Sequence, residues 1–196
     1  MTDTLIRLKN RLTDDEFFEL CQMNELRMER LKDGTIIMME PTGSDTGGFN
    51  NEVSYEITHW NKSTKEGKTF DSSTGFTLPD TSVKSPDTSW VKKDRWQQLS
   101  EELREKFAPI APDFVLEIRS KSDKLKDLQE KMQEYIKNGV RLGWLIDRKN
   151  KMTYIYRLDG SISSIPFDEI LDGENVLVGF KLCVADIEAE QERQFF

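Results

Sequence analysis

The chain has 196 residues, of which 36% are hydrophobic and 33% are charged, a balance typical of a folded globular protein. Its 28 basic and 36 acidic side chains give a net charge of −8. That charge argues against a protein that coats nucleic acid non-specifically, because such proteins gain affinity by neutralising phosphates. The two cysteines lack CxxC spacing, no apolar run approaches the ~18–20 residues of a membrane span, and no signal-peptide core opens the chain. These features predict one domain over residues 1–196, without a membrane segment, in a reducing cytoplasm.

The first elements in the chain are predicted to be a helix and a hairpin. The helix is expected over 13–23, with Thr13 as N-cap and Glu16 three residues later as its capping-box partner. Two β-prone runs follow at 26–31 and 35–39, and an Asp-Gly turn joins them. Asp-Gly between such runs is a strong hairpin signal.

The next part of the chain is predicted to alternate loops, strands and short helices. The Gly-rich segment 41–48 lacks the Gly-Lys-Ser/Thr ending of a phosphate-binding loop, and we expect a flexible connection there. Apolar spacing in 50–61 predicts a helix. A hairpin over 70–78, a strand over 88–91 and one or two short charged helices within 93–107 are expected to follow.

The second half of the chain has the clearest pattern, a strand over 112–119 and then a helix over 122–138. Apolar residues of that helix repeat every three and four positions, and Gly139 follows as a C-cap signal. Two strands come next, over 141–147 and 152–157. Strand, helix and strand in this order imply a mixed sheet with a crossover helix. The tail is expected to hold short irregular pieces within 167–188, with a last strand near 182–184.

Two Pro-Asp dipeptides, at Asp87 and Asp113, each open a β-prone stretch. Carboxylates at strand ends hold divalent metals in many phosphodiesterases, since Mg²⁺ prefers hard oxygen ligands and keeps positions open for water and phosphate. Pro-Asp is also common in turns, so the two dipeptides alone do not identify a metal site. Because strand side chains alternate, Asp113, Glu117 and Arg119 are expected on one face.

Glu117 is the strongest single candidate, because an acid on the partly buried face of a core strand is costly unless it is paired or bound to a metal. It is expected near the carboxyl end of the strand, where α/β sheets place their sites. The structural alternative is an ion pair with Arg119 or with a lysine of the next helix.

Lys131 is the basic candidate, because it is expected on the rim of the apolar stripe of the 122–138 helix. From there its stem can pack along the core while its ammonium is directed at the sheet, where it could orient or activate water and stabilise phosphate charge. The alternative is a solvated helix lysine, which spacing alone favours.

These segments together match a known family: Pro86-Asp87, the run from Pro112 to Asp123, Lys131 with Tyr135, Gly139-Val140, and the run from Trp144 to Asp147. They resemble the Uma-type restriction endonucleases, a bacterial branch of the PD-(D/E)XK nuclease superfamily. The run from Glu29 to Ile36 also looks like the N-terminal hairpin of that family.

The resemblance implies an α/β (α+β mixed) fold of the restriction endonuclease-like kind. A central mixed β-sheet would be flanked by helices, with an N-terminal helix and a β-hairpin before it. The core would span about 24–158, and 159–196 would be a C-terminal extension. Nucleases that cut two strands often pair, so a homodimer is expected, with an aromatic surface around Trp90 and Trp96 as one way to build it.

For the site, the resemblance implies that Asp87 and Glu117 ligate Mg²⁺, for which Mn²⁺ could substitute. The lysine of the family motif normally stands two residues after the second acid, where this chain has Arg119. Lys131 would take over that role from the following helix, while Arg119 would contact phosphate or fill the site. Glu29 and Glu52 would be auxiliary acids.

Two functions are therefore predicted. The first is a Mg²⁺-dependent endonuclease that hydrolyses DNA phosphodiester bonds with metal-activated water. The alternative, motivated by the net charge of −8 and by Arg119, is a catalytically inactive nuclease-fold protein that acts as a binding or homo-oligomeric assembly module.

Overall fold

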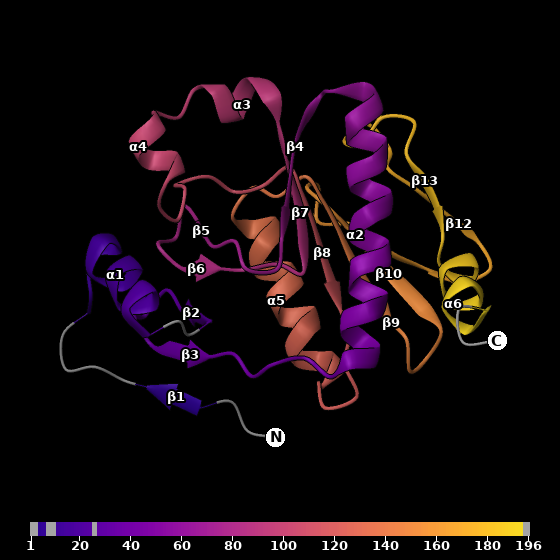
Figure 1. Ribbon diagram of the computed structural model, residues 1–196, viewed down its shortest axis with the longest axis horizontal. Helices are drawn as coiled ribbons and strands as arrows, with labels where there is room; N and C mark the ends of the chain where they lie inside the picture. The colour runs from indigo at the N-terminus through magenta and orange to yellow at the C-terminus, as the bar shows by residue number, and fades with distance from the viewer. Residues whose placement is uncertain (1–3, 7–10, 25–26, 194–196) are drawn as a thin grey trace.

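The computed structural model describes residues 4–6, 11–24 and 27–193, and its centre is a six-stranded mixed sheet (Figure 1). Within this sheet β8 and β9 run parallel, while the other neighbouring pairs run antiparallel. Helices α2 and α5 cover its two faces, which confirms the predicted fold class. In spatial order the strands are β11 (Ile162–Pro166), β10 (Met152–Arg157), β9 (Leu142–Asp147), β8 (Phe114–Ile118), β7 (Thr88–Lys92) and β4 (Gly67–Asp71).

The alternation of side chains along β8 decides what each helix covers. Phe114 and Leu116 pack in the cluster beneath α2 (Ser44–Thr64). Val115 belongs to the opposite cluster, beneath α5 (Leu125–Lys137), which makes the crossover between the parallel strands β8 and β9. Glu117 shares the α5 face with Val115, because residues two apart on a strand point the same way.

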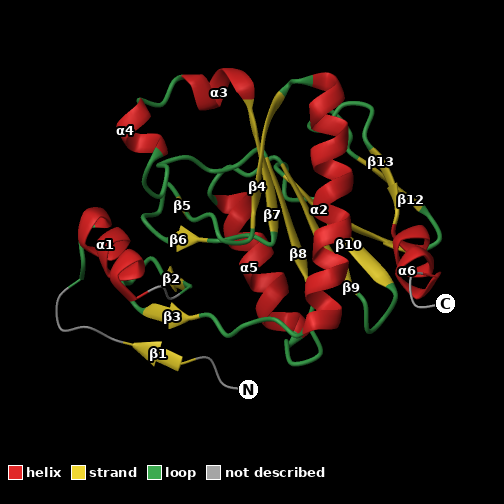
Figure 2. Ribbon diagram, viewed as in Figure 1, coloured by secondary structure: helices red, strands yellow, loops and turns green. Residues whose placement is uncertain are grey.

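A smaller five-stranded sheet lies beside the first and packs against α1 (Asp14–Asn24) (Figure 2). The predicted hairpin is present here as β2 and β3, although Leu26 lies outside the described residues. The expected capping box is confirmed, since the Thr13 hydroxyl accepts from the Glu16 amide and the Glu16 carboxylate accepts from the Thr13 amide. The strand order is β1 (Thr4–Ile6), β3 (Ile36–Met38), β2 (Met28–Arg30), β6 (Val83–Lys84) and β5 (Phe76–Thr77).

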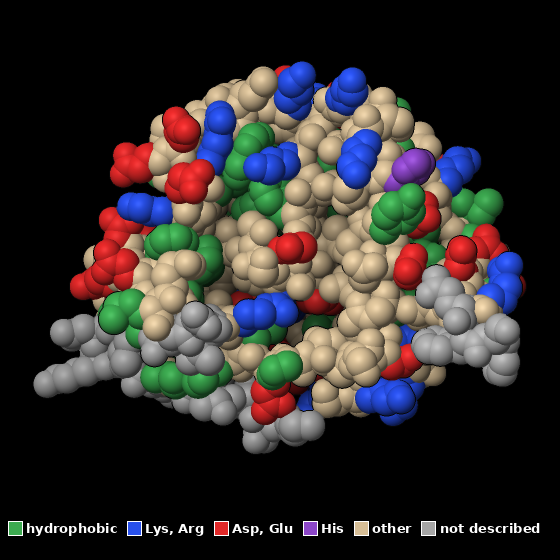
Figure 3. Space-filling view, in the orientation of Figure 1, with side chains coloured by type: hydrophobic (Ala, Val, Ile, Leu, Met, Phe, Trp, Pro, Cys, Tyr) green, Lys and Arg blue, Asp and Glu red, His purple; other side chains and the backbone are tan. Residues whose placement is uncertain are grey.

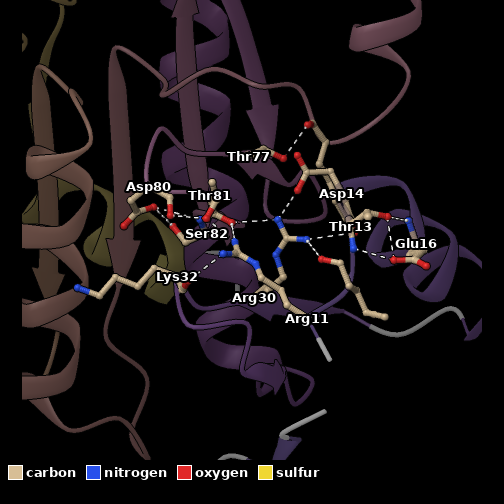
Figure 4. A network of polar contacts seen from close by, with 12 residues as sticks. Arg11, Thr13, Asp14, Glu16, Arg30, Lys32, Thr77, Asp80, Thr81 and Ser82 are labelled. Atoms are coloured by element: carbon tan, nitrogen blue, oxygen red, sulfur yellow. Dashed lines mark hydrogen bonds and ion pairs between the residues drawn. The ribbon is translucent and has the colours of Figure 1, made fainter. Parts of the chain in front are cut away.

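A buried arginine ties this small sheet together (Figure 4). Arg30, on β2, is 1% exposed. Its guanidinium donates to the carbonyl oxygens of Leu12 and Thr13, each at 3.2 Å, and of Thr81 at 2.9 Å. It also forms an ion pair with Asp14 at the start of α1. One side chain therefore joins α1, β2 and the turn before β6.

Replacing Arg30 with methionine should lower the free energy of unfolding by about 2–3 kcal/mol, because it removes a buried guanidinium that donates to three backbone carbonyl oxygens and pairs with Asp14. Urea unfolding followed by circular dichroism measures this loss. Arg11→Met is the matched control, because Arg11 also donates to Thr81 but is exposed, and its loss should stay below about 1 kcal/mol. Equal losses in the two variants would contradict the role given to Arg30.

Two predicted elements are wrong in the middle of the chain. The flexible loop expected over 41–48 ends at Gly43, and α2 begins at Ser44 despite the glycines of its first turns. Burial of Phe49 outweighs the roughly 1 kcal/mol that a helical glycine costs. The hairpin expected over 70–78 is absent, because β4 pairs with β7 and β5 pairs with β6 in the other sheet. Strand patterning identifies a strand but not its partner.

The tail is more regular than predicted and packs on the large sheet. Phe167, Leu171 and Ile187 are buried in the cluster under α2. The strand predicted near 182–184 is present, and a C-terminal helix that was not predicted follows it.

The prediction of an exposed aromatic surface around Trp90 is wrong, since Trp90 is 2% exposed and lies in the core. The remaining elements are α3 (Lys93–Gln97), α4 (Glu101–Arg104), β12 (Ile170–Asp172), β13 (Lys181–Cys183) and α6 (Val184–Arg193). Among the helices in the described ranges, none is long and apolar enough to cross a membrane.

Candidate active site

A pocket of about 620 Å³ opens where the two sheets, α5 and the first turns of α2 meet. Asp87, Glu117 and Lys131, which lie far apart in the sequence, all line it. The face of the molecule drawn in Figure 3 is hollowed near its centre, where acidic and basic side chains lie next to each other. The structure thus brings the three main sequence candidates to one cavity.

Glu117 lies at the carboxyl end of β8, and two side chains of α5 bond to one of its carboxylate oxygens. Its Oε1 accepts from the Tyr135 hydroxyl at 2.9 Å and pairs with the Lys131 Nζ at 2.8 Å. Burial raises the pKa of Glu117 to about 7, and the nearby charges of Asp87 and Glu29 add to the rise while Lys131 opposes it. Of the two structural alternatives for Glu117, the ion pair with a helix lysine is present.

Asp87 reaches the pocket from the residue before β7. Its Oδ2 accepts a hydrogen bond from the backbone amide of Ile118 at 2.8 Å, which ties it to the end of β8 beside Glu117. Burial raises the pKa of Asp87, although this hydrogen bond and the charge of Lys131 act against the rise. The chain thus holds two carboxylates at the pocket despite their mutual repulsion.

Lys131 is not a solvated helix lysine. Its side chain is 12% exposed, and its Nζ contacts Glu117 at 2.8 Å and the Glu29 Oε1 at 3.0 Å. Although burial lowers the pKa of Lys131, the carboxylates of Glu117 and Glu29 raise it above its ordinary value. The side chain therefore stays an ammonium, which can donate but cannot act as a general base.

Glu29 and Lys84 support this ammonium from the small sheet. Glu29, on β2, accepts from the Ser85 amide at 3.0 Å and pairs with Lys84 at 3.5 Å as well as with Lys131. Burial raises the pKa of Glu29, but Lys131 and Lys84 together bring it below its ordinary value. Lys84 in turn pairs with Glu134 of α5 at 3.2 Å. A chain of alternating charges, buried except at Glu134, thus joins the two sheets behind the pocket.

The sequence reasoning missed two members of this cluster, Lys84 and the hydroxyl of Tyr135. Tyr135 stands four residues after Lys131, and this spacing places both on one helix face, which was the available signal. For Lys84 there was no local signal, because the pairing of β6 with β2 brings it to Glu29 and the packing of β6 against α5 brings it to Glu134.

Three other acidic or basic candidates lie elsewhere. Arg119 does not meet Glu117; its guanidinium pairs with Asp147 at 3.0 Å. Asp113, at the opposite end of β8, is held by Arg95 at 2.8 Å and marks the entry to the strand. Glu52 lines a separate shallow depression on α2, so the geometry does not bring it to the cluster, and its auxiliary role stays a prediction.

The donors in the pocket suit a hard divalent cation that also keeps water. The described residues contain no group of three or more His, Cys, Asp or Glu side chains that could hold a metal ion. Asp87 and Glu117 nevertheless each keep one carboxylate oxygen, Oδ1 and Oε2, that bonds to no described residue and is not among the buried unpartnered atoms. Two carboxylate oxygens with water as the remaining ligands match the coordination that Mg²⁺ favours.

The mixed sheet, its crossover helix and the acids at the strand ends define a protein of the restriction endonuclease-like class. Residues 14–185 match the family model described as "Uma2: Putative restriction endonuclease", and the chain belongs to this family. Its fold is similar to the crystal structure of a "putative nuclease belonging to DUF820" from Anabaena variabilis ATCC 29413. That match has a TM-score of 0.75 at 22% sequence identity and covers 91% of this chain and 98% of the other. A search of curated proteins found no match.

Proposed function

We propose that the chain is a Mg²⁺-dependent endonuclease that hydrolyses DNA phosphodiester bonds, with Mn²⁺ as a substitute ion. The observation that carries this proposal is the convergence of Asp87, Glu117 and Lys131 on one pocket, with a free carboxylate oxygen on each acid. Membership of a family described as "Putative restriction endonuclease" supports the choice of DNA as substrate.

Asp87 and Glu117 would hold the cation. When bound, a divalent cation supplies charge neutralisation at the phosphate and lowers the pKa of water. Tyr135 and Lys131 fix the Oε1 of Glu117, which leaves its Oε2 as the oxygen available at the pocket. The protein thus fixes both acids before any ligand enters, so little reorganisation is needed.

Lys131 would act on the phosphate as a donor. An ammonium has three N–H groups, and Glu117 and Glu29 accept from two of them. The third can donate to a phosphate oxygen or to a water in the pocket that Lys131 lines. Because its charge is held by two carboxylates, Lys131 is suited to stabilising negative charge that develops on the phosphate.

Purified protein should convert supercoiled plasmid to nicked or linear DNA with Mg²⁺ or Mn²⁺, and EDTA should stop the reaction. Asp87→Asn should lower this activity by about 100-fold or more, because it removes one of two charged oxygens from the site. Gel analysis of plasmid forms over time measures the rate. Asp94→Asn is the matched control, since Asp94 is exposed on α3 and does not line the pocket, so the change should be silent. Full activity of Asp87→Asn would overturn the assignment of that residue.

One observation favours a second candidate, a nuclease-fold protein without catalysis that serves as a binding or assembly module. The Glu117 carboxylate is already engaged by Lys131 and Tyr135, as in a structural ion pair. If the protein is such a module, its melting temperature should be the same with and without Mn²⁺. A rise with Mn²⁺ in the original protein that Asp87→Asn lacks would count against it.

A further inference from the structure

A second pocket, of about 410 Å³, continues from the first. The two share four lining residues, Asp45, Thr46, Ser120 and Lys121. The second pocket extends toward the turn between β9 and β10, which carries Arg148 and Lys149. A ligand that fills the first pocket and is longer than one phosphate therefore has a continuous path along the surface.

This path is basic in a chain whose net charge is −8. Its lining has two acids, Asp45 and Glu188, and the following five cations: Arg119, Lys121, Arg148, Lys149 and Lys151. A local excess of positive charge in an acidic protein is the electrostatic mark of a surface for a polyanion.

Of these five cations, three form ion pairs with described residues and two do not. Arg119 is paired with Asp147, while Arg148 and Lys151 pair with Glu188. Lys121 and Lys149 are exposed, and neither forms an ion pair with any residue that the structure describes. These two lysines are the cations of the path whose charge is available to a ligand.

The two segments that carry Lys121 and Lys149 are fixed by hydrogen bonds and by a contact with an aromatic ring. The side-chain amide of Asn150 donates to Asp147 at 2.7 Å, and this bond fixes the turn that carries Lys149. Arg148 lies over the Phe49 ring at 4.5 Å, which joins the same turn to the start of α2. In the other loop, the Ser120 amide donates to the Asp123 carboxylate at 2.8 Å, next to Lys121. Lys121 and Lys149 therefore line the path from two different segments, each of which is fixed by hydrogen bonds.

We propose that Lys121 and Lys149 bind phosphates of the DNA strand that flank the cleaved phosphate, so that the second pocket guides the strand away from the acidic site. This inference rests on the proposed function, since it takes DNA as the ligand of the first pocket. Lysines bind phosphates as point charges, so these contacts set position and affinity without reading sequence.

The test measures binding of a fluorescein-labelled DNA duplex by fluorescence anisotropy, without divalent cations, from 50 to 200 mM salt. The variant Lys121→Glu/Lys149→Glu is compared with Lys62→Glu/Lys93→Glu, which makes the same charge change near the far end of α2. The slope of log K against log salt should flatten by about 2 in the first variant, because each phosphate contact contributes about 0.9. Its affinity at 50 mM salt should fall at least about tenfold. The control should keep the original slope.

A second readout separates this inference from the proposed function. With Mn²⁺, the Lys121→Glu/Lys149→Glu protein should show a raised KM for duplex cleavage and an unchanged kcat. An original protein that binds DNA through these lysines but cuts none with Mg²⁺ or Mn²⁺ would overturn the nuclease function and leave the binding path standing. An original protein that cuts DNA, with the variant matching the control in slope and KM, would overturn the path alone.

Discussion

Glu117→Gln is expected to lower the rate of DNA cleavage by about 1,000-fold or more, which corresponds to roughly 4 kcal/mol of lost transition-state stabilisation. Glutamine keeps the shape of glutamate and can still accept from Tyr135 and Lys131, so the pocket keeps its form. What disappears is the negative charge at the Oε2 oxygen, on which metal binding depends. Single-turnover cleavage of plasmid DNA with Mn²⁺ measures the effect.

The stability of the same variant distinguishes a functional acid from a structural one. Burial opposes ionisation of Glu117, and its pKa rises to about 7, so the fold bears a cost for this charge. Because Lys131 keeps Glu29 as a second carboxylate partner, Glu117→Gln should unfold at the same urea concentration as the original protein, or at a higher one, while its cleavage is lost. Glu130→Gln, an exposed change on α5, controls for the loss of one acid and should change neither property. Unchanged cleavage together with lower stability in Glu117→Gln would mark Glu117 as a structural residue.

Lys131→Met is the second change with a large expected effect, and it should reduce both stability and cleavage. It leaves Glu117 without its cation and leaves Glu29 with Lys84 alone. Removing one partner from a buried ion pair costs about 3–5 kcal/mol, because the other charge stays buried. Cleavage should fall by roughly 100- to 1,000-fold, the usual effect of removing one group that stabilises charge in the transition state.

Urea unfolding and single-turnover cleavage measure the two effects of Lys131→Met. Lys126→Met is the matched control, since Lys126 lies on the same helix, is 82% exposed and pairs with Glu130 across one turn. It should cost below about 1 kcal/mol and leave cleavage unchanged. A Lys131→Met protein that folds with the original stability and cuts at the original rate would remove Lys131 from the site.

The part of the fold that carries the site was predictable because its signals are local. The two-residue alternation of β8 placed Glu117 opposite the Leu116 face, and the three- and four-residue spacing of α5 placed Lys131 near the apolar stripe. The crossover between β8 and β9 followed from the order of elements, and Gly139 ends α5 with a positive φ of 98° as its position suggested. Periodicity thus gave both the elements and the directions of these side chains.

The features that the sequence could not predict depend on contacts between residues far apart in the chain. Lys84 supports the site because the small sheet packs against α5, and nothing in its local sequence indicates this contact. The strand β4 looked like half of a hairpin with β5 but pairs with β7. The segment 41–48 looked like a loop by composition, yet the burial of Phe49 draws its second half into α2. In each case a tertiary contact outweighed the local propensity.

The family resemblance seen in the sequence is confirmed, and it identified Asp87, which alternation along a strand could not select. The solved relative supports the fold of 91% of the chain. The roles of Asp87, Glu117 and Lys131 in catalysis stay predictions, because sequence, fold and geometry converge on them without testing chemistry. Their proximity in one pocket, which the structure adds, makes those roles open to direct measurement.

The most direct test of the central claim is the Mn²⁺ dependence of plasmid cleavage by the original protein and by Glu117→Gln, measured side by side under single-turnover conditions. The account predicts that the original protein cuts in proportion to Mn²⁺ occupancy, stops with EDTA, and loses about 1,000-fold or more of its rate in Glu117→Gln. Equal rates for the two proteins, or cleavage by the original protein that EDTA does not stop, would contradict it.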